Sequence, residues 1–247
     1  GDSFDDAQKE AQKQINENTI FIHPFDDNTV IEGQGTIALE ILDQIDKHFD
    51  YLIIPIGGGG LISGIITVFN KLSPKTKIIG VEAEGAPAMS RSLDQKKIIE
   101  LNKIDNFVDG VSIKKIGKIP FEICKEHLDD LLVIPEGKIC QTILDLYNKD
   151  GIVVEPAGAI GISAFEMYHE KFINKNVGIL ICGGNNDIIR MSEIKERALL
   201  FSKLKHYFIV RFPQRAGALK EFVNNILCYH FQLQNSIISL LIVETIV

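Results

Sequence analysis

Hydrophobic residues along this chain follow two patterns: short continuous apolar runs, and longer stretches in which apolar positions recur every three or four residues. The runs predict buried strands, and the recurring stretches predict helices with one apolar face. The expected strands are residues 19–23, 51–56, 77–82, 131–134, 177–181, 206–212 and 237–243. The expected helices are residues 3–16, 30–47, 61–72, 119–127, 136–149, 190–205 and 218–227.

Apolar strands that are separated by helices indicate an α/β fold, with a mostly parallel sheet covered by helices on both faces. Such sheets bind ligands at the carboxyl ends of their strands. Two glycine-rich turns lie at such ends, residues 57–60 after the strand 51–56 and residues 182–184 after the strand 177–181. We therefore expect a functional site where the two turns meet.

Composition narrows the class of ligand. The 247 residues are 45% hydrophobic and 24% charged, which is typical of a soluble globular protein. The net charge of −7 and the scattered Lys and Arg argue against nucleic acid or an anionic membrane as a partner, and no apolar run is long enough to span a bilayer. Four widely spaced cysteines without a CxxC pair argue against a disulfide framework or a zinc site, and favour the cytoplasm. A small molecule is the expected ligand.

The tract of four glycines at residues 57–60 predicts a cradle for a phosphate group. Glycine tolerates positive φ, so the tract can turn its N–H groups toward one point, and the following helix adds free N–H donors and a positive dipole end. The tract lacks the Gly-Lys-Ser/Thr ending of a nucleotide P-loop, which argues against an ATPase.

Two other interpretations of the tract stay open at this point. The spacing of Gly58, Gly60 and Ser63 nearly fits the dinucleotide fingerprint, with Glu82 about 20 residues further on and the third glycine displaced to Gly64. This pattern would suit an NAD-binding oxidoreductase. A glycine-rich turn without any ligand is the other alternative.

Three motifs together resemble a known family. They are Glu-Gly-Gln-Gly-Thr at residues 32–36, the tetraglycine tract, and Glu-Pro-Ala-Gly-Ala at residues 155–159, which is followed by Cys-Gly-Gly-Asn at 182–185. In order and spacing they resemble the later two thirds of threonine dehydratase, a fold-type II pyridoxal-phosphate enzyme. The resemblance covers residues 1–227, although each motif alone also occurs in serine racemase and cysteine synthase. Residues 212–219 resemble the start of an ACT-like regulatory domain, which favours the biosynthetic form.

The resemblance implies pyridoxal 5′-phosphate as cofactor, with Cys182 facing the pyridine nitrogen and Glu155 as a polar group near the pocket. The implied cofactor-binding residues are Gly57, Gly58, Gly59, Gly60, Leu61, Cys182 and Glu155. Plainer roles stay open: a small buried hydrophobe for Cys182, and a helix-dipole partner for Glu155. Residues 33–36 could simply cap the helix that follows, and residues 109–111, which border the family's pocket, could be a turn. No metal site is expected, because Ala88 stands where the metal pattern of serine racemase needs a carboxylate.

The implied reaction is the dehydration and deamination of L-threonine to 2-oxobutanoate and ammonia, the first step of isoleucine biosynthesis. An amino-acid substrate, an isoleucine effector and a homo-oligomer follow from the same resemblance. The alternatives are a non-catalytic module that binds phosphate or pyridoxal phosphate, and a serine dehydratase or serine racemase-like enzyme.

The chain also departs from the family. The Ser-Phe-Lys segment with the lysine that binds the cofactor, and the Ser-Gly-Asn-His loop that holds its ring, occur nowhere in the sequence. We therefore assign no catalytic residue and expect this chain alone to be inactive, as a threonine dehydratase without its N-terminal part and most of its regulatory part. The expected units are a catalytic portion at residues 1–189, a connector helix at 190–205 and a truncated ACT-like domain at 206–247.

Overall fold

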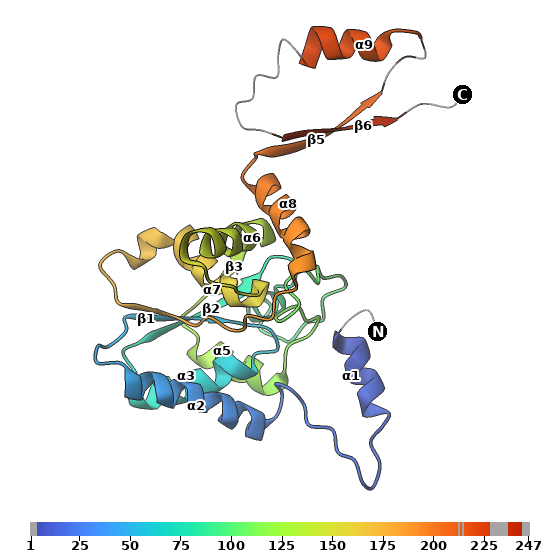
Figure 1. Cartoon of the computed structure of the whole chain (residues 1–247). Coiled ribbons are helices and arrows are strands. Elements are labelled where there is room, and N and C mark those ends of the chain that lie inside the picture. Colours follow the sequence, from blue (N-terminus) through green and yellow to red (C-terminus); the bar gives the residue numbers. More distant parts are fainter. Residues whose placement is uncertain (1–3, 212, 214, 228–236, 244–247) are drawn as a thin grey trace.

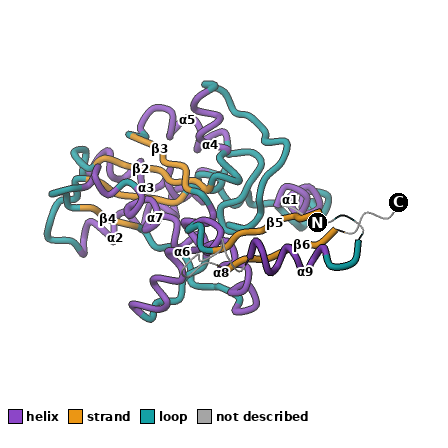
Figure 2. Tube along the Cα trace, turned by 90° about the horizontal axis from the view of Figure 1, so that it is seen from above, coloured by secondary structure: helices purple, strands orange, loops and turns teal. Residues whose placement is uncertain are grey.

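The computed structural model describes residues 4–211, 213, 215–227 and 237–243, which form a layered part and a small C-terminal unit (Figure 1). The layered part contains a parallel sheet with helices on both faces, so the expected α/β fold class is confirmed. In Figure 2 the small unit, with strands β5 and β6 and helix α9, extends outward from the layered part. None of the helices in the described ranges is long and apolar enough to cross a lipid bilayer.

The central sheet has the strand order β3-β2-β1-β4, and all of its pairings are parallel. Its strands are β1 (Tyr51–Pro55), β2 (Lys77–Ala83), β3 (Asp130–Ile134) and β4 (Val177–Ile179). Leu52 and Ile54 pack into one helix layer, whereas Ile53 packs into the other, because successive side chains of a strand point to opposite faces. Burial on both faces explains why these strands are continuously apolar. Since β1 pairs with β4, the carboxyl ends of these two strands are neighbours.

Helices cover the sheet on both sides (Figure 1). One layer is α2 (Asn28–Gln44), α3 (Gly60–Leu72) and α5 (Lys118–His127), and the other contains α6 (Glu136–Asp145) and α7 (Pro156–Met167). A π-helical turn, Leu146–Asp150, continues α6, and the expected helix at 190–205 is the shorter α8 (Met191–Phe201). The short helix α4 (Ala88–Asp94) lies in a stretch for which no regular structure was expected.

Helices α2 and α3 cross at Gly35 and Gly64. A Cβ atom on Gly64 would lie 2.5 Å from the backbone nitrogen of Gly35 and 2.5 Å from the carbonyl oxygen of Ile31. Gly64 is therefore a helix-packing residue, and its position gives no support to a dinucleotide fingerprint. The proposed cap at residues 33–36 is also wrong, because these residues lie inside α2, whose N-terminus is capped by the Asp27 side chain.

The strand expected at residues 19–23 is not formed. The segment contributes a single antiparallel bridge between Asn16 and Thr19, and Ile20 and Ile22 are 84% and 63% exposed. A strand needs a neighbouring strand to pair its backbone groups, and none of the described strands lies beside this segment. The preceding helix α1 (Phe4–Gln12) is shorter than the expected 3–16, and Ser3 of its expected capping box lies outside the described residues.

The C-terminal unit follows α8 directly. Strand β5 (Lys205–Arg211) pairs in parallel with β6 (Ile237–Val243), and α9 (Ala218–Phe222) lies between them in the sequence. The strands expected at residues 206–212 and 237–243 are both present, although residue 212 itself lies outside the described residues. A π-helical turn, Val223–Leu227, continues α9.

Candidate functional site

A cavity of about 270 Å³ opens at the carboxyl ends of β1 and β4. Its lining residues are Pro24, Phe25, Gln34, Pro55, Gly57, Gly58, Gly59, Gly60, Leu61, Gly110, Val111, Glu155, Ala157 and Cys182. All seven residues predicted to bind a cofactor lie in this lining. Gln34 and the pair Gly110 and Val111, for which the sequence left plainer roles open, line it as well. The fold thus brings the two glycine-rich turns to one site.

The glycine tract is built differently from the expectation. Only Gly59 of the four glycines has a positive φ, at 93°. The others are required by close approach: a Cβ on Gly57 would lie 3.0 Å from the Cα of Val111, and one on Gly58 would lie 2.1 Å from the ring of Phe25. Three glycines therefore make room for neighbouring groups, and one makes the turn.

The turn presents free hydrogen-bond donors to the cavity. Within residues 4–211, the N–H groups of Gly58, Gly59, Gly60 and Leu61 have no hydrogen-bond acceptor. They stand at the start of α3, where N–H groups have no partner inside the helix and the dipole is positive. The Ser63 hydroxyl donates to the carbonyl oxygen of Gly59 at 2.6 Å and holds the turn. An anion in the cavity would satisfy these donors.

Phe25 is a site residue that the sequence reasoning missed. Its ring lies against Gly58, and its Cα would be 3.0 Å from a Cβ on Gly60. The His23 ring holds this segment in place, since its Nδ1 accepts a hydrogen bond from the Asp26 N–H at 2.9 Å. No periodic signal marks Phe25, because it lies in an irregular segment between α1 and α2.

Glu155 stands at the N-cap of α7, but its carboxylate makes no capping hydrogen bond. Its Oε1 would lie 3.3 Å from a Cβ on Gly110 and 2.3 Å from one on Gly183, which has a φ of 76°. The carboxylate therefore lies between two glycines at the cavity. Gly158, from the same motif, lets the backbone of residues 182–183 approach α7, since a Cβ there would lie 2.5 Å from the carbonyl oxygen of Cys182.

The Cys182 thiol keeps its proton at neutral pH. Burial, together with the smaller effect of the nearby Glu155 carboxylate, raises its pKa to about 11. A neutral thiol beside a cofactor ring nitrogen would leave that nitrogen without a counter-ion, unlike an aspartate at the same place. The cofactor-binding role of Cys182 stays a prediction.

Glu155→Gln should increase the reactivity of Cys182, because removal of a neighbouring negative charge lowers the pKa of the thiol. We expect iodoacetamide at pH 8.5 to modify Cys182 about threefold faster in this variant than in the unmodified chain. Mass spectrometry of the Cys182 peptide measures the rate separately from those of the other cysteines. Cys124 and Cys140 are internal controls, since both are buried with a pKa of about 12. An unchanged rate at Cys182 would contradict the placement of Glu155.

Pyridoxal phosphate fits the cavity at its phosphate end and beside its ring. The free N–H groups of residues 58–61 suit a phosphate dianion, and Cys182 and Glu155 lie on the neighbouring turns. Among the described residues that line the cavity, however, none is a lysine. The chain's own lining therefore offers phosphate and ring contacts but no amine for covalent attachment.

Glu82, the acidic residue of the dinucleotide interpretation, lies outside the cavity lining. Its two carboxylate oxygens accept hydrogen bonds from the N–H groups of Met89 and Ser90 at 2.7 and 2.8 Å, and the side chain is buried. Glu82 thus caps α4, and the NAD-binding alternative loses its acidic residue as well as its third glycine.

Comparison with known proteins agrees with the geometry. The family model of the pyridoxal-phosphate dependent enzymes matches residues 1–183, and that of the C-terminal regulatory domain of threonine dehydratase matches residues 196–231. The chain is 55% identical over 228 residues to the L-threonine dehydratase biosynthetic IlvA of Halalkalibacterium halodurans, covering 92% of this chain and 55% of the relative. The corresponding Bacillus subtilis protein is 50% identical over 228 residues, covering 92% of this chain and 54% of the relative. The chain thus spans about half the length of the curated relatives that it matches.

Solved structures show the same likeness. The processed form of threonine deaminase isoform 2 from Solanum lycopersicum superposes with a TM-score of 0.75 at 36% identity, covering 80% of this chain and 58% of that one. Maize serine racemase superposes with a TM-score of 0.68 at 29% identity, covering 81% of this chain and 61% of that one. The match to the family model extends over most of the layered part and includes every predicted cofactor-binding residue. The chain belongs to the family of pyridoxal-phosphate dependent enzymes.

Proposed function

We propose that this chain forms the phosphate- and ring-binding part of a threonine dehydratase, which converts L-threonine to 2-oxobutanoate and ammonia. The observation that carries the proposal is the row of free N–H groups at residues 58–61, which belong to the same cavity lining as Cys182. The high identity to biosynthetic threonine dehydratases supports threonine as the substrate.

The chain's residues have separate tasks in this proposal. The N–H groups of residues 58–61 bind the cofactor phosphate, and the helix dipole of α3 adds to their attraction. The Cys182 thiol stays neutral and orients the ring edge, and Glu155 places its carboxyl group beside the same turn. The bound cofactor supplies an electron-withdrawing ring that makes the α-proton of the amino acid acidic. Loss of this proton and of the β-hydroxyl, followed by hydrolysis, gives the 2-oxo acid and ammonia.

The remaining parts of the proposal concern partners and location. The regulatory-domain match at residues 196–231 supports an amino-acid effector, and we propose isoleucine. We also propose a homo-oligomer, which would cover the exposed side chains of Ile188 and Ile189. A reducing cytoplasm agrees with the free thiols of Cys124, Cys140 and Cys182. The division at residues 189 and 205 into a catalytic portion, a connector and a regulatory portion belongs to the same proposal.

The chain alone is expected to form no 2-oxobutanoate from L-threonine, even with added pyridoxal phosphate. The physical reason is the cavity lining, in which no described residue offers an amine. Addition of the segment of the Bacillus subtilis relative that the chain does not cover should restore turnover. Formation of 2-oxobutanoate is measured for the chain, for the segment and for the mixture, with L-serine as the alternative substrate.

Three outcomes would change the proposal. Turnover by the chain alone would place a catalytic amine within these 247 residues. Equal turnover of serine and threonine by the mixture would favour a serine dehydratase. A chain that fails to bind pyridoxal phosphate or inorganic phosphate would refute the phosphate cradle itself.

A further inference from the structure

One wall of the cavity is a loop, residues 105–111, that enters from outside the central sheet. Gly110 and Val111 of this loop line the cavity beside Gly57, the first residue of the glycine tract. The contact is close, because a Cβ on Gly57 would lie 3.0 Å from the Cα of Val111. A small shift of the loop therefore changes the space beside the phosphate cradle.

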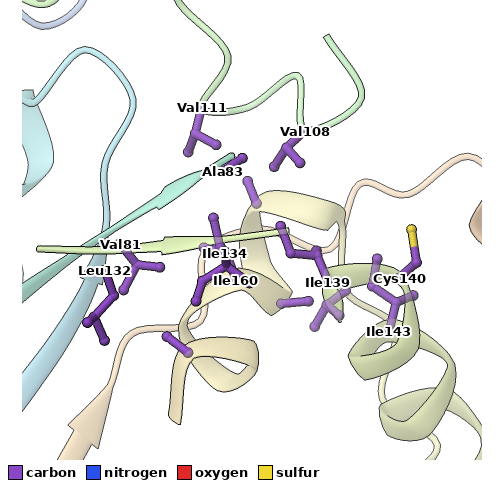
Figure 3. Packing of buried hydrophobic residues seen from close by; sticks show 14 of the residues in the cluster. Val81, Ala83, Val108, Val111, Leu132, Ile134, Ile139, Cys140, Ile143 and Ile160 are labelled. Atoms are coloured by element: carbon purple, nitrogen blue, oxygen red, sulfur yellow. The ribbon is translucent and has the colours of Figure 1, made fainter. Parts of the chain in front are cut away.

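The inner side of the loop is anchored in the core. Figure 3 shows Val108 and Val111 reaching from the loop toward Ala83, at the end of β2, and both valines are buried. The Ser112 hydroxyl donates to the carbonyl oxygens of Asp105 and Val108, at 3.0 and 2.8 Å. The apolar side of the loop is thus fixed by packing and by local hydrogen bonds.

The outer side of the loop is held by two arginines from the region of α8. Phe107, which is 4% exposed, lies under both guanidinium groups, with its ring centre 5.1 Å from the Cζ of Arg190 and 4.3 Å from that of Arg197. Cations over an aromatic face attract it electrostatically. Arg197 Nη1 also donates to Asp105 Oδ2 at 2.8 Å. Arg190 donates to the carbonyl oxygen of Phe107 and pairs with Asp109 at 3.3 Å.

The charges of Asp105 and Arg197 agree with this arrangement. Partial burial acts to raise the pKa of the Asp105 carboxyl, but the hydrogen bond from Arg197 and the Phe107 N–H outweigh it and lower the pKa. Both members are therefore ionised at neutral pH.

The same helix leads to the C-terminal unit. Glu196 of α8 accepts hydrogen bonds from the side chains of Lys205 and Tyr207, which belong to β5. Two adjacent residues of α8 thus contact both parts: Arg197 contacts the cavity loop and Glu196 contacts the C-terminal unit.

We propose that Arg190 and Arg197 are positioning residues, which hold loop 105–111 against the glycine tract and so set the width of the pyridoxal-phosphate cavity. The proposal rests on the proposed cofactor site and adds to it a dependence on α8. Neither arginine lines the cavity, so both act through Phe107 and the loop.

The test compares Arg190→Met and Arg197→Met with the unmodified chain. The matched control is Lys138→Met, which removes the 2.7 Å ion pair between α6 and Glu166 of α7 without touching the loop. The first readout is hydrogen–deuterium exchange of peptides that cover residues 105–113, without ligand. The second is the affinity for pyridoxal phosphate and for inorganic phosphate. Arg197→Lys keeps the charge but not the planar stack over Phe107, and it serves as the conservative variant.

We expect both methionine variants to increase exchange at residues 105–113 by at least about threefold and to weaken pyridoxal phosphate by about threefold to tenfold. Arg197→Lys should recover part of both effects, and Lys138→Met should show neither. Unchanged exchange in both variants would overturn the proposal. Increased exchange together with an unchanged affinity for pyridoxal phosphate, in a chain that binds this cofactor, would overturn the proposal as well. If the unmodified chain binds no cofactor, the proposed function fails, while the exchange result still decides whether the arginines order the wall.

Discussion

Gly58→Ala is expected to weaken the binding of pyridoxal phosphate by more than about tenfold. The added Cβ would lie 2.1 Å from ring atoms of Phe25, so either the ring or the glycine tract must move. Movement of the tract turns the free N–H groups of residues 58–61 away from a common point, and the phosphate loses its donors. Titration with the cofactor, followed by absorbance, measures the change.

Two further variants make this result specific. Gly33→Ala is the matched control, because its Cβ position inside α2 has no atom within 4 Å apart from its chain neighbours and the helix's own backbone. It should leave the affinity unchanged and stabilise the fold by up to about 1 kcal/mol. In a Phe25→Ala background, Gly58→Ala should have a much smaller effect, since the colliding ring is gone. An unchanged affinity of the single Gly58→Ala variant would refute the cradle.

Glu82 is expected to make the stability of the chain depend strongly on pH. Burial raises the pKa of this carboxyl to about 8 in the folded state, against the opposing effect of the hydrogen bonds from Ser90 and Met89. In the unfolded chain the group has its ordinary pKa of about 4.3. Between these two pKa values, Glu82 therefore keeps its proton in the folded state but has lost it in the unfolded state.

The sign follows from proton linkage. The contribution of Glu82 is fully present below pH 4.3 and is lost as the pH rises toward about 8, at about 1.4 kcal/mol per pH unit. Urea unfolding at pH 5, 6, 7 and 8 measures the free energy of unfolding for the unmodified chain and for Glu82→Gln, which does not titrate. The free energy of unfolding of the unmodified chain, relative to that of Glu82→Gln, should fall by a few kcal/mol across this range. A difference that stays constant with pH would mean that Glu82 is already ionised at pH 5 in the folded protein.

The strands and helices of the layered part could be predicted because each depends on a local pattern. The run at residues 51–56 is apolar at successive positions, which point to opposite faces of a strand, and β1 is buried on both faces. The segment at residues 19–23 carries a similar signal, but it forms no strand because pairing needs a second chain segment beside it. Helix α4 escaped prediction because its capping group, Glu82, comes from β2 and not from the preceding turn.

The location of the candidate site could also be predicted from local patterns. Glycine tracts at the carboxyl ends of parallel strands must meet at one edge of a sheet, so the sequence alone places Gly57–Gly60 and Cys182 together. The function of each glycine could not be predicted. Gly58 is needed because of Phe25, and Gly64 because of Gly35, and both pairs join segments about 30 residues apart.

Local patterns in the sequence thus specify the α/β fold, the strand ends and the place of the glycine tract, since periodicity, turn residues and motif spacing act over a few residues. The tertiary structure alone determines which groups close the cavity and what holds them there. Phe25 reaches the glycine tract from an irregular segment, and Phe107 reaches Arg197 across some 90 positions of sequence. Such contacts depend on how the helices and loops pack in three dimensions, and no pattern of neighbouring residues encodes them.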